Sequence, residues 1–334
     1  MKIFQVRNLL LLFAFAVLFG CAAKSDVTTI KLGHGLDPTH PVHKAMEFMA
    51  EKVKEKSNGK LQVAIYPSQQ LGTERQCVEL LQIGSLGMTK ISASVMENFS
   101  PLFTVFSLPY VFSDEQHGFD VLDSDIGRKI LTSSEKYLLR GLCYYDAGSR
   151  SFYTIKTPIN SPKDLDGLKI RTQESQTSVK LVNSLGGSAT PIAWGELYTA
   201  LQQGVVDGAE NNPPSFYLSK HYEVCKYYSL DEHTAVPDVL VISTKIWNSL
   251  SPEEQKWLQE AVDESTVYQR KIWKEASQHA LEEVEKAGVE IIRPNKQPFE
   301  EKIQSLYEEY KNKPEIYNLL QEIKGFKSDD NIKE

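Results

Sequence analysis

Two arginines are the residues of this sequence best suited to bind a small anion. Arg150 lies in the segment DAGSRSFYT, just after an apolar and aromatic stretch, and Arg171 ends the predicted strand LKIR. Ligands of α/β proteins bind in the crevice at the carboxyl ends of the strands, toward which an arginine at that end points. A guanidinium keeps its charge at any working pH, and its paired N–H donors match a carboxylate. The alternative for each arginine taken alone is a surface ion pair.

The segment LQQGVVDGAENN offers a second set of polar groups. It ends on Glu210, Asn211 and Asn212, which stand between an apolar pair of valines and a rigid pair of prolines. This carboxylate and these two amides either form a polar turn or present hydrogen-bonding groups to a ligand. Neither alternative is excluded by the segment alone.

The sequence does not favour a metal, a cofactor or an enzymatic active site. The segment GHGLDPTHPVH supplies His34, Asp37, His40 and His43, residue types that bind metals. However, His40 and His43 flank a predicted helix start, which favours a polar loop over a metal site. The segment begins like a dinucleotide fingerprint, but Pro38 stands where the third glycine belongs. The metalloprotease, hydrolase and P-loop motifs are absent from the sequence.

Strand-like and helix-like segments alternate along the chain, which predicts an α/β fold. Pro41 begins a predicted helix that stops at Asn58, and Thr73 opens another with a capping box. A third helix begins at Ser251 with a capping box and Pro252 at its first position, and no further Pro or Gly interrupts it before Gly288. A helix of this length extends about 54 Å, more than the roughly 30 Å diameter of a small domain. We therefore expect it to touch more than one lobe.

Length and composition indicate a globular protein of about two domains. The chain has 334 residues, of which 41% are hydrophobic, enough for a sizeable core. Its formal net charge of −7 and the lack of a basic cluster disfavour nucleic acid as a partner. Cys77, Cys143 and Cys225 show no metal-like spacing, so we expect buried free thiols, with one disulfide as the alternative.

The first residues predict export. MKIFQVRN is basic, and an unbroken apolar run of about 16 Å as a helix follows, too short for the roughly 30 Å core of a membrane. The run ends in LFGC, which resembles a bacterial lipobox with Cys21 as the lipidated residue. The alternative is an ordinary export signal, cut after Ala22 or Ala23.

A long block of the sequence resembles the extracytoplasmic solute receptors of TRAP transporters, of the C4-dicarboxylate-receptor type. The block is GLKIRTQESQTSVKLVNSLGGSATPIAWGELYTALQQGVVDGAENN, and YPSQQLGTERQCVELLQIGSLGMTK, FSLPYVF and YEVCKYY extend the likeness. The resemblance implies a two-lobed α/β fold of the periplasmic-binding-protein kind (type II), with a ligand cleft between lobes and a long helix spanning both. The expected divisions are a signal peptide at 1–20, lobe 1 at 27–148 plus 237–276, lobe 2 at 149–236 plus 277–325, and a flexible tail at 326–334.

The resemblance also implies a function. Such receptors bind organic acids outside the cytoplasmic membrane and hand them to a membrane permease without chemical change. We expect an exported, periplasmic monomer without a cofactor, held at the membrane if Cys21 is acylated. The alternatives are the same receptor type serving a sensor and, from another class, a secreted sugar-acid lyase or isomerase.

Five site residues follow from the family's motifs. In such receptors the arginine of L-K-I-R, here Arg171, holds the ligand carboxylate, and the asparagine of D-G-x-E-N, here Asn211, adds a hydrogen bond. Arg150 matches a second arginine at the lobe crossover. Trp194 follows T-P and offers a flat apolar face for a sugar ring. Glu74 is the expected hydroxyl acceptor.

Further residues narrow the ligand. Ser92 stands where the sialic-acid branch carries an acidic residue, which disfavours sialic acid. Tyr217 and Asp238 add polar groups that suit a hydroxylated acid, and His34 is a weaker candidate to meet hydroxyls. The run GAENNPPSFY is similar to the hexuronate-binding branch, so D-glucuronate or D-galacturonate is the expected ligand. A C4-dicarboxylate, a 2-oxo acid or an aldonate is the alternative.

Overall fold

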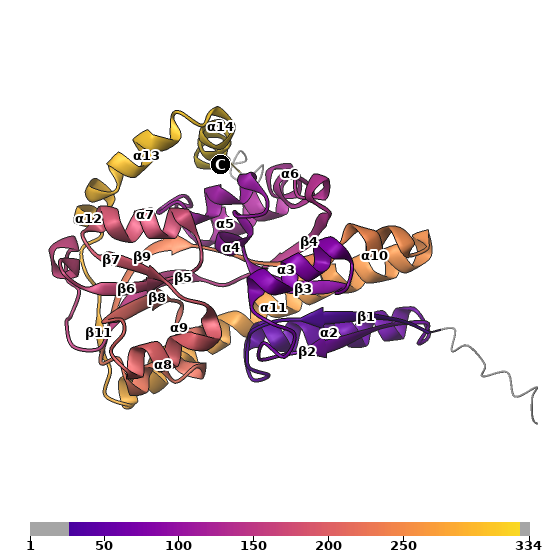
Figure 1. Cartoon of the computed structure of the whole chain (residues 1–334), viewed down its shortest axis with the longest axis horizontal. Coiled ribbons are helices and arrows are strands. Elements are labelled where there is room, and N and C mark those ends of the chain that lie inside the picture. The colour runs from indigo at the N-terminus through magenta and orange to yellow at the C-terminus, as the bar shows by residue number, and fades with distance from the viewer. Residues whose placement is uncertain (1–26, 328–334) are drawn as a thin grey trace, which may run out of the picture.

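The computed structural model describes residues 27–327, and its strands form two separate sheets (Figure 1). The signal peptide and the lipidation site at Cys21 lie outside the described residues, as does most of the predicted tail. The first sheet contains, in spatial order, β2 (Leu61–Tyr66), β1 (Thr28–Gly33), β3 (Met88–Ser92), β10 (Asp238–Ser243) and β4 (Leu139–Tyr145). The second contains β11 (Glu290–Ile292), β9 (Tyr227–Ala235), β5 (Ser149–Thr154), β8 (Gly208–Asn211), β6 (Lys169–Thr172) and β7 (Ser188–Pro191).

Helices surround each sheet, so that each forms the centre of one lobe (Figure 1). The first lobe carries α2 (Pro41–Lys56), α3 (Glu74–Ile83), α4 (Ala93–Met96), η1 (Pro101–Ser107), α5 (Glu115–Asp123), α6 (Asp125–Thr132), η2 (Glu135–Tyr137) and α10 (Thr244–Ser249). The second carries η3 (Pro162–Leu165), α7 (Gln176–Leu185), η4 (Trp194–Glu196), α8 (Leu197–Gln202), α9 (Pro213–Leu218) and η5 (His221–Glu223). The rest are α11 (Pro252–Lys286), α12 (Gln297–Lys302), α13 (Gln304–Tyr310) and α14 (Pro314–Lys324). The alternation predicted from the sequence is confirmed.

The helix ends follow from capping chemistry. The Thr73 hydroxyl oxygen accepts a hydrogen bond from the Gln76 N–H, and the Thr73 N–H donates one to Oε1 of Gln76, which forms the predicted capping box of α3. That helix stops where Gly84 takes the left-handed conformation at φ 83°. In α2, Met46, Met49 and Val53 recur at helical spacing and are buried.

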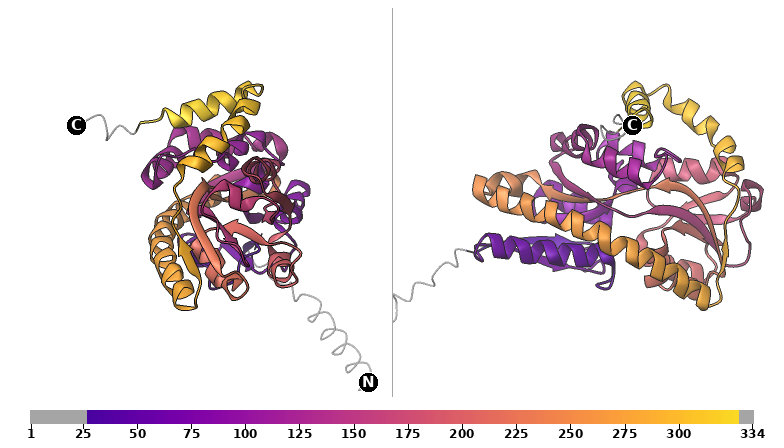
Figure 2. Two further views of the ribbon diagram at one scale, coloured as in Figure 1. Left: turned by 90° about the vertical axis from the view of Figure 1, so that its left-hand side faces the viewer. Right: turned by 180° about the vertical axis from the view of Figure 1, so that it is seen from behind.

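The long helix α11 spans both lobes, as expected from its uninterrupted sequence. It has 35 residues and begins with the predicted capping box of Ser251 and Glu254. It packs against α2 and β4 of the first lobe and against α9 of the second. Seen from behind, it runs along most of the length of the molecule (Figure 2).

Besides α11, two adjacent segments carry the chain between the lobes, and α11 supports the first of them. Tyr145 pairs with Asp238 in one sheet, and Ser149 pairs with Ala235 in the other, so segments 146–148 and 236–237 form the crossovers. Gln269 of α11, which is fully buried, binds the Asp146 backbone twice: its Oε1 accepts from N and its Nε2 donates to O, both at 2.8 Å.

Replacing Gln269 with leucine is expected to lower the free energy of unfolding by about 1–3 kcal/mol, because both backbone groups of Asp146 lose their partner in a buried position. Urea denaturation measures the loss. The matched control is Gln259→Leu on the same helix, since Gln259 is only half-buried and binds a single backbone carbonyl, that of Leu142. Equal losses for the two variants would argue against a special role for the crossover.

The last helices pack on both lobes and lie over the top of the molecule in the view of Figure 1. Helices α12 and α13 contact α7, whereas α14 packs on η1 (Figures 1 and 2). The strands of the two sheets lie on opposite sides of the expected divisions at residues 148 and 237, although the divisions themselves stay a prediction.

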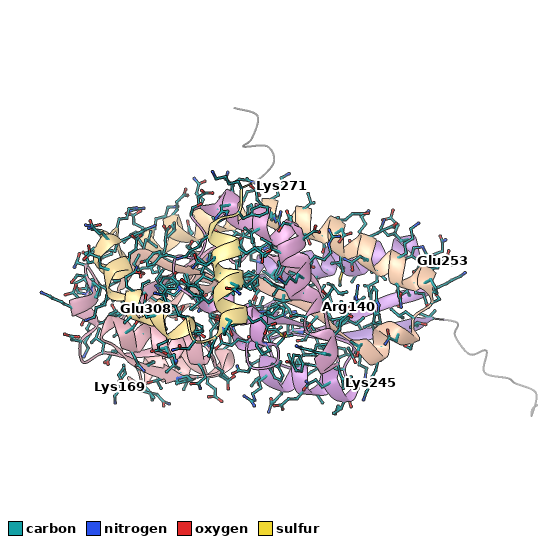
Figure 3. All side chains as sticks on the ribbon, turned by 90° about the horizontal axis from the view of Figure 1, so that it is seen from above. Arg140, Lys169, Lys245, Glu253, Lys271 and Glu308 are labelled. Atoms are coloured by element: carbon teal, nitrogen blue, oxygen red, sulfur yellow. The ribbon has the colours of Figure 1, made fainter. Side chains whose placement is uncertain are left out.

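The described surface and core are ordinary for a globular protein. Exposed charged side chains of both signs project outward, among them Lys169, Glu253 and Lys271 (Figure 3). Across residues 27–327, the helices are all too short or too polar to cross a membrane. The three cysteines within this range are buried free thiols, as predicted.

Candidate ligand-binding site

A pocket lies between the two lobes, next to the crossovers. Counting the space that is open to solvent, it has a volume of about 630 Å³. Its lining includes these residues named from the sequence: Glu74, Ser92, Arg150, Arg171, Trp194, Asn211 and Asp238. The structure therefore brings together side chains that are up to 164 positions apart in the chain.

Arg171 reaches the pocket as a buried cation that forms no salt bridge within residues 27–327. It is 2% exposed, and its Nε donates to the Ile192 carbonyl at 2.9 Å. Its Nη1 is buried and has no hydrogen-bond partner among residues 27–327. Burial lowers the pKa of this guanidinium. Because a buried charge is costly unless it is paired, an anion bound next to Arg171 would offset the cost of burying this guanidinium.

Arg150 is buried as well, but its charge is already neutralised. Its Nε donates to Oε2 of Glu210 at 2.5 Å, and its Nη2 donates to Oε1 of the same carboxylate at 2.9 Å. Burial tends to raise the pKa of Glu210, but the Arg150 charge and hydrogen bonds outweigh it and lower the pKa to about 2. Of the two arginines, Arg171 is therefore the one with charge left for a ligand.

Asn211 lines the pocket, and the protein holds its side-chain oxygen. Its Oδ1 accepts from Nη1 of Arg150 at 2.8 Å and from the Asn212 N–H at 2.9 Å, which identifies the oxygen. Its Nδ2 has no partner among the described residues and keeps its donors for a ligand. Arg171 pairs with Ala209, two residues before Asn211, so the strand alternation places both side chains on one face of the sheet.

Glu210 and Asn212, which flank Asn211 in the segment LQQGVVDGAENN, bind groups of the protein itself. Glu210 binds Arg150. Asn212 caps α9, because its Oδ1 accepts from the Ser215 N–H at 2.9 Å. Tyr228 donates to the Asn211 carbonyl at 2.8 Å and fixes the backbone at this point.

The first lobe contributes a wall centred on Lys90, which sequence reasoning missed. Lys90 is 3% exposed, and its Nζ donates to Glu74 Oε1 at 2.7 Å and to Asp238 Oδ1 at 3.1 Å. Ser92 pairs with Asp238 across the sheet, and Lys90 stands two residues earlier, so the three share one face. The available signal was a lysine inside the apolar strand segment GMTKISAS.

Two of the weaker candidates lie outside the lining of this pocket. The His34 ring faces α2, where its Nε2 lies 2.9 Å from His43 Nδ1 and its Nδ1 accepts from the Leu36 N–H at 3.1 Å. Burial lowers the pKa of His34 to about 2, so the ring is neutral. Tyr217 stacks on Tyr222, with 5.6 Å between ring centroids. The lining instead includes Gln173 and Glu174 of the second lobe, which were not predicted from the sequence.

Trp194 lies beside the buried cation. Its ring centroid is 5.8 Å from Cζ of Arg171, a distance at which a guanidinium and an indole attract each other. The side chain is half-buried and lines the pocket. It therefore presents an apolar surface next to the position where an anion would bind Arg171.

Hydrogen bonds join the lobes around the pocket. His40 Nε2 lies 3.3 Å from Ser215 Oγ. The carboxylate of Glu97 in the first lobe accepts from Ser175 Oγ at 2.8 Å and from the Thr177 N–H at 3.0 Å, at the start of α7. These contacts hold the lobes together, so ligand exchange requires that they open.

The model of "Bacterial extracellular solute-binding protein, family 7" matches residues 32–313, nearly the whole described chain. This chain belongs to that family. Protein YiiZ of Salmonella typhimurium is 38% identical to this family 7 protein over 303 residues, which make up 90% of this chain and 92% of YiiZ. The family comprises the solute receptors of TRAP transporters, as the sequence predicted.

Two solved receptors share the fold of this family 7 protein. A TRAP periplasmic solute-binding protein from Bradyrhizobium sp. BTAi1, in complex with α/β-D-galacturonate, is 40% identical with a TM-score of 0.87, over 90% of this chain and all of that one. The corresponding protein from Anaerococcus prevotii, with bound α/β-D-glucuronate, is 38% identical with a TM-score of 0.86, over 89% and 97%. These similarities confirm the predicted two-lobed type II fold.

Proposed function

We propose that this receptor captures a hexuronate, D-glucuronate or D-galacturonate, by its carboxylate and delivers it to a TRAP permease. The observation that carries the proposal is the buried, unpaired Nη1 of Arg171 in the pocket between the lobes. Its guanidinium and the amide of Asn211 supply N–H donors on one wall, which suits one planar carboxylate. The ligands of the two solved relatives support the choice of acid.

The remaining lining fits the sugar ring. Trp194 offers the apolar face on which a pyranose packs, and Glu74, Ser92 and Asp238 offer acceptors for hydroxyl groups. Arg150 supports the site by holding the oxygen of the Asn211 amide. A ligand that touches both walls stabilises the closed arrangement of the lobes, because those contacts exist together only when the lobes are closed.

We propose that the receptor acts by binding alone. It binds the acid without chemical change, as a monomer in the periplasm, and acylation of Cys21 would keep it close to the permease. The alternative ligands are a C4-dicarboxylate, a 2-oxo acid and an aldonate. A sugar-acid lyase or isomerase would need groups that reach a bound substrate and exchange protons with it.

Thermal unfolding with matched ligands tests the proposal. D-Glucuronate and D-galacturonate at about 100 times their Kd are expected to raise Tm by about 5 °C or more, because a ligand that binds only the folded state stabilises it. D-Glucose and D-galactose, which carry a hydroxymethyl group in place of the carboxylate, should give no shift. A larger shift with malate or with a 2-oxo acid would indicate that this acid, and not a hexuronate, is the ligand. Turnover of the uronate, followed by NMR, would support the enzyme.

A further inference from the structure

The three charged side chains on the first-lobe wall form a compact trio. Lys90 lies between Glu74 and Asp238 and binds one oxygen of each. All three side chains are at most 13% exposed, and all three line the pocket. They come from β3, α3 and β10, so the sheet and its covering helix fix their positions.

Each carboxylate of the trio keeps one oxygen for a ligand. Only Glu74 Oε1 and Asp238 Oδ1 accept hydrogen bonds from the protein, as far as residues 27–327 show. The other two oxygens are acceptors without a donor. Lys90 uses two of its three N–H donors on the carboxylates, which leaves one. Two acceptors beside one donor match neighbouring hydroxyl groups, which both donate and accept.

The two walls of the pocket differ in charge. With its groups ionised, the trio carries one net negative charge, because two carboxylates share one ammonium. Burial raises the pKa of Asp238, and the Lys90 ammonium opposes that rise. On the opposite wall, Glu210 neutralises Arg150, and Arg171 is left with its positive charge. A ligand is therefore directed with its anionic end toward the second lobe and its neutral end toward the first.

We infer that the Glu74–Lys90–Asp238 trio is a charge filter, which accepts the hydroxyl end of a single-carboxylate ligand and rejects ligands with a second carboxylate. The inference rests on the proposed function, in that Arg171 holds the first carboxylate. A second carboxylate at the trio would bring no proton to donate and would face two like charges in a buried site. A hydroxyl group at the same place satisfies a free acceptor oxygen. Lys90 acts as a positioning residue that keeps both carboxylates in the wall.

Isothermal titration of the whole receptor with matched acids tests the filter. Each single acid is compared with the diacid that oxidation of its other end would give: D-glucuronate and D-gluconate with D-glucarate, and D-galacturonate with galactarate. We expect the wild-type receptor to bind the diacids at least about 100-fold more weakly than the tightest single acid, since the like charges oppose them. A diacid that binds as tightly as its single-acid partner would overturn the filter.

Glu74→Gln removes the net charge of the trio and leaves Lys90 paired with Asp238. It is expected to reduce the ratio of the diacid Kd to the single-acid Kd at least about 10-fold. Glu79→Gln, an exposed residue of the same helix, should leave the ratio unchanged, and the Tm of both ligand-free variants verifies folding. An unchanged ratio in a folded Glu74→Gln variant contradicts the inference. Binding of gluconate but of neither uronate, with the diacids still rejected, contradicts the hexuronate proposal and supports the filter.

Discussion

Arg171→Met is expected to weaken binding of the acid strongly and to leave the ligand-free receptor at least as stable as the wild type. Arg171 is buried, and its Nη1 has no partner among the described residues, so the folded state without ligand bears an uncompensated charge. An apolar side chain of similar length removes that cost. The lost carboxylate contact should weaken binding by about 2–5 kcal/mol, or about 30-fold to several thousand-fold.

The matched control is Arg150→Met, the other buried arginine of the pocket. This variant removes the partner of Glu210 and leaves a buried carboxylate alone, so it should destabilise the receptor. Titration calorimetry with D-galacturonate and thermal unfolding without ligand measure the two effects. If Arg171→Met kept the affinity, or lost as much stability as Arg150→Met, the assignment of Arg171 as the carboxylate clamp would be wrong.

The second large effect is expected from Glu210→Gln, which should lower the free energy of unfolding by about 3–5 kcal/mol. The amide has the shape of the carboxylate, but it leaves the Arg150 guanidinium buried without a counter-charge. Urea denaturation at neutral pH measures the loss. Glu79→Gln, which breaks an exposed pair with Arg75, is the comparison and should cost less than about 1 kcal/mol.

The same variant should change how stability depends on pH. The folded pKa of Glu210 is about 2, below its ordinary value of 4.5, so its contribution is present above about pH 4.5 and is lost as the pH falls toward 2. Burial opposes the charge of His233, but the Asp231 and Glu210 carboxylates raise its pKa to about 9. The contribution of His233 is therefore complete below its ordinary pKa of 6.5 and is lost as the pH rises through 9. Glu210→Gln should flatten the acid side of the profile, and an unaltered acid slope would contradict the role of this ion pair.

Local chemistry determines the elements that could be predicted from the sequence. The capping boxes at Thr73 and Ser251 mark the starts of α3 and α11, because a cap depends on residues three positions apart. The uninterrupted helical period of α11 likewise predicts a helix that touches both lobes. Such signals are contained in short windows and need no knowledge of the distant chain.

The candidate site depends on contacts that no short window contains. The role of Lys90 depends on its contact with Asp238, which lies 148 residues away. The role of Glu210 depends likewise on Arg150, 60 residues earlier. His34 could not be placed, since the choice between the pocket and His43 depends on the packing of α2. The resemblance to the TRAP receptors predicted a place in the pocket for Arg171 and Asn211, because residues at the same motif position occupy the same place in the fold.

A crystal structure of the receptor with D-galacturonate would show directly whether Arg171 and Asn211 hold the carboxylate of the ligand. We expect both oxygens of the ligand carboxylate to lie within about 3.2 Å of N–H donors of Arg171 and Asn211, with the ring against Trp194 and the hydroxyls toward Lys90. A carboxylate bound at Lys90 instead, with hydroxyl groups at Arg171, would contradict this expectation.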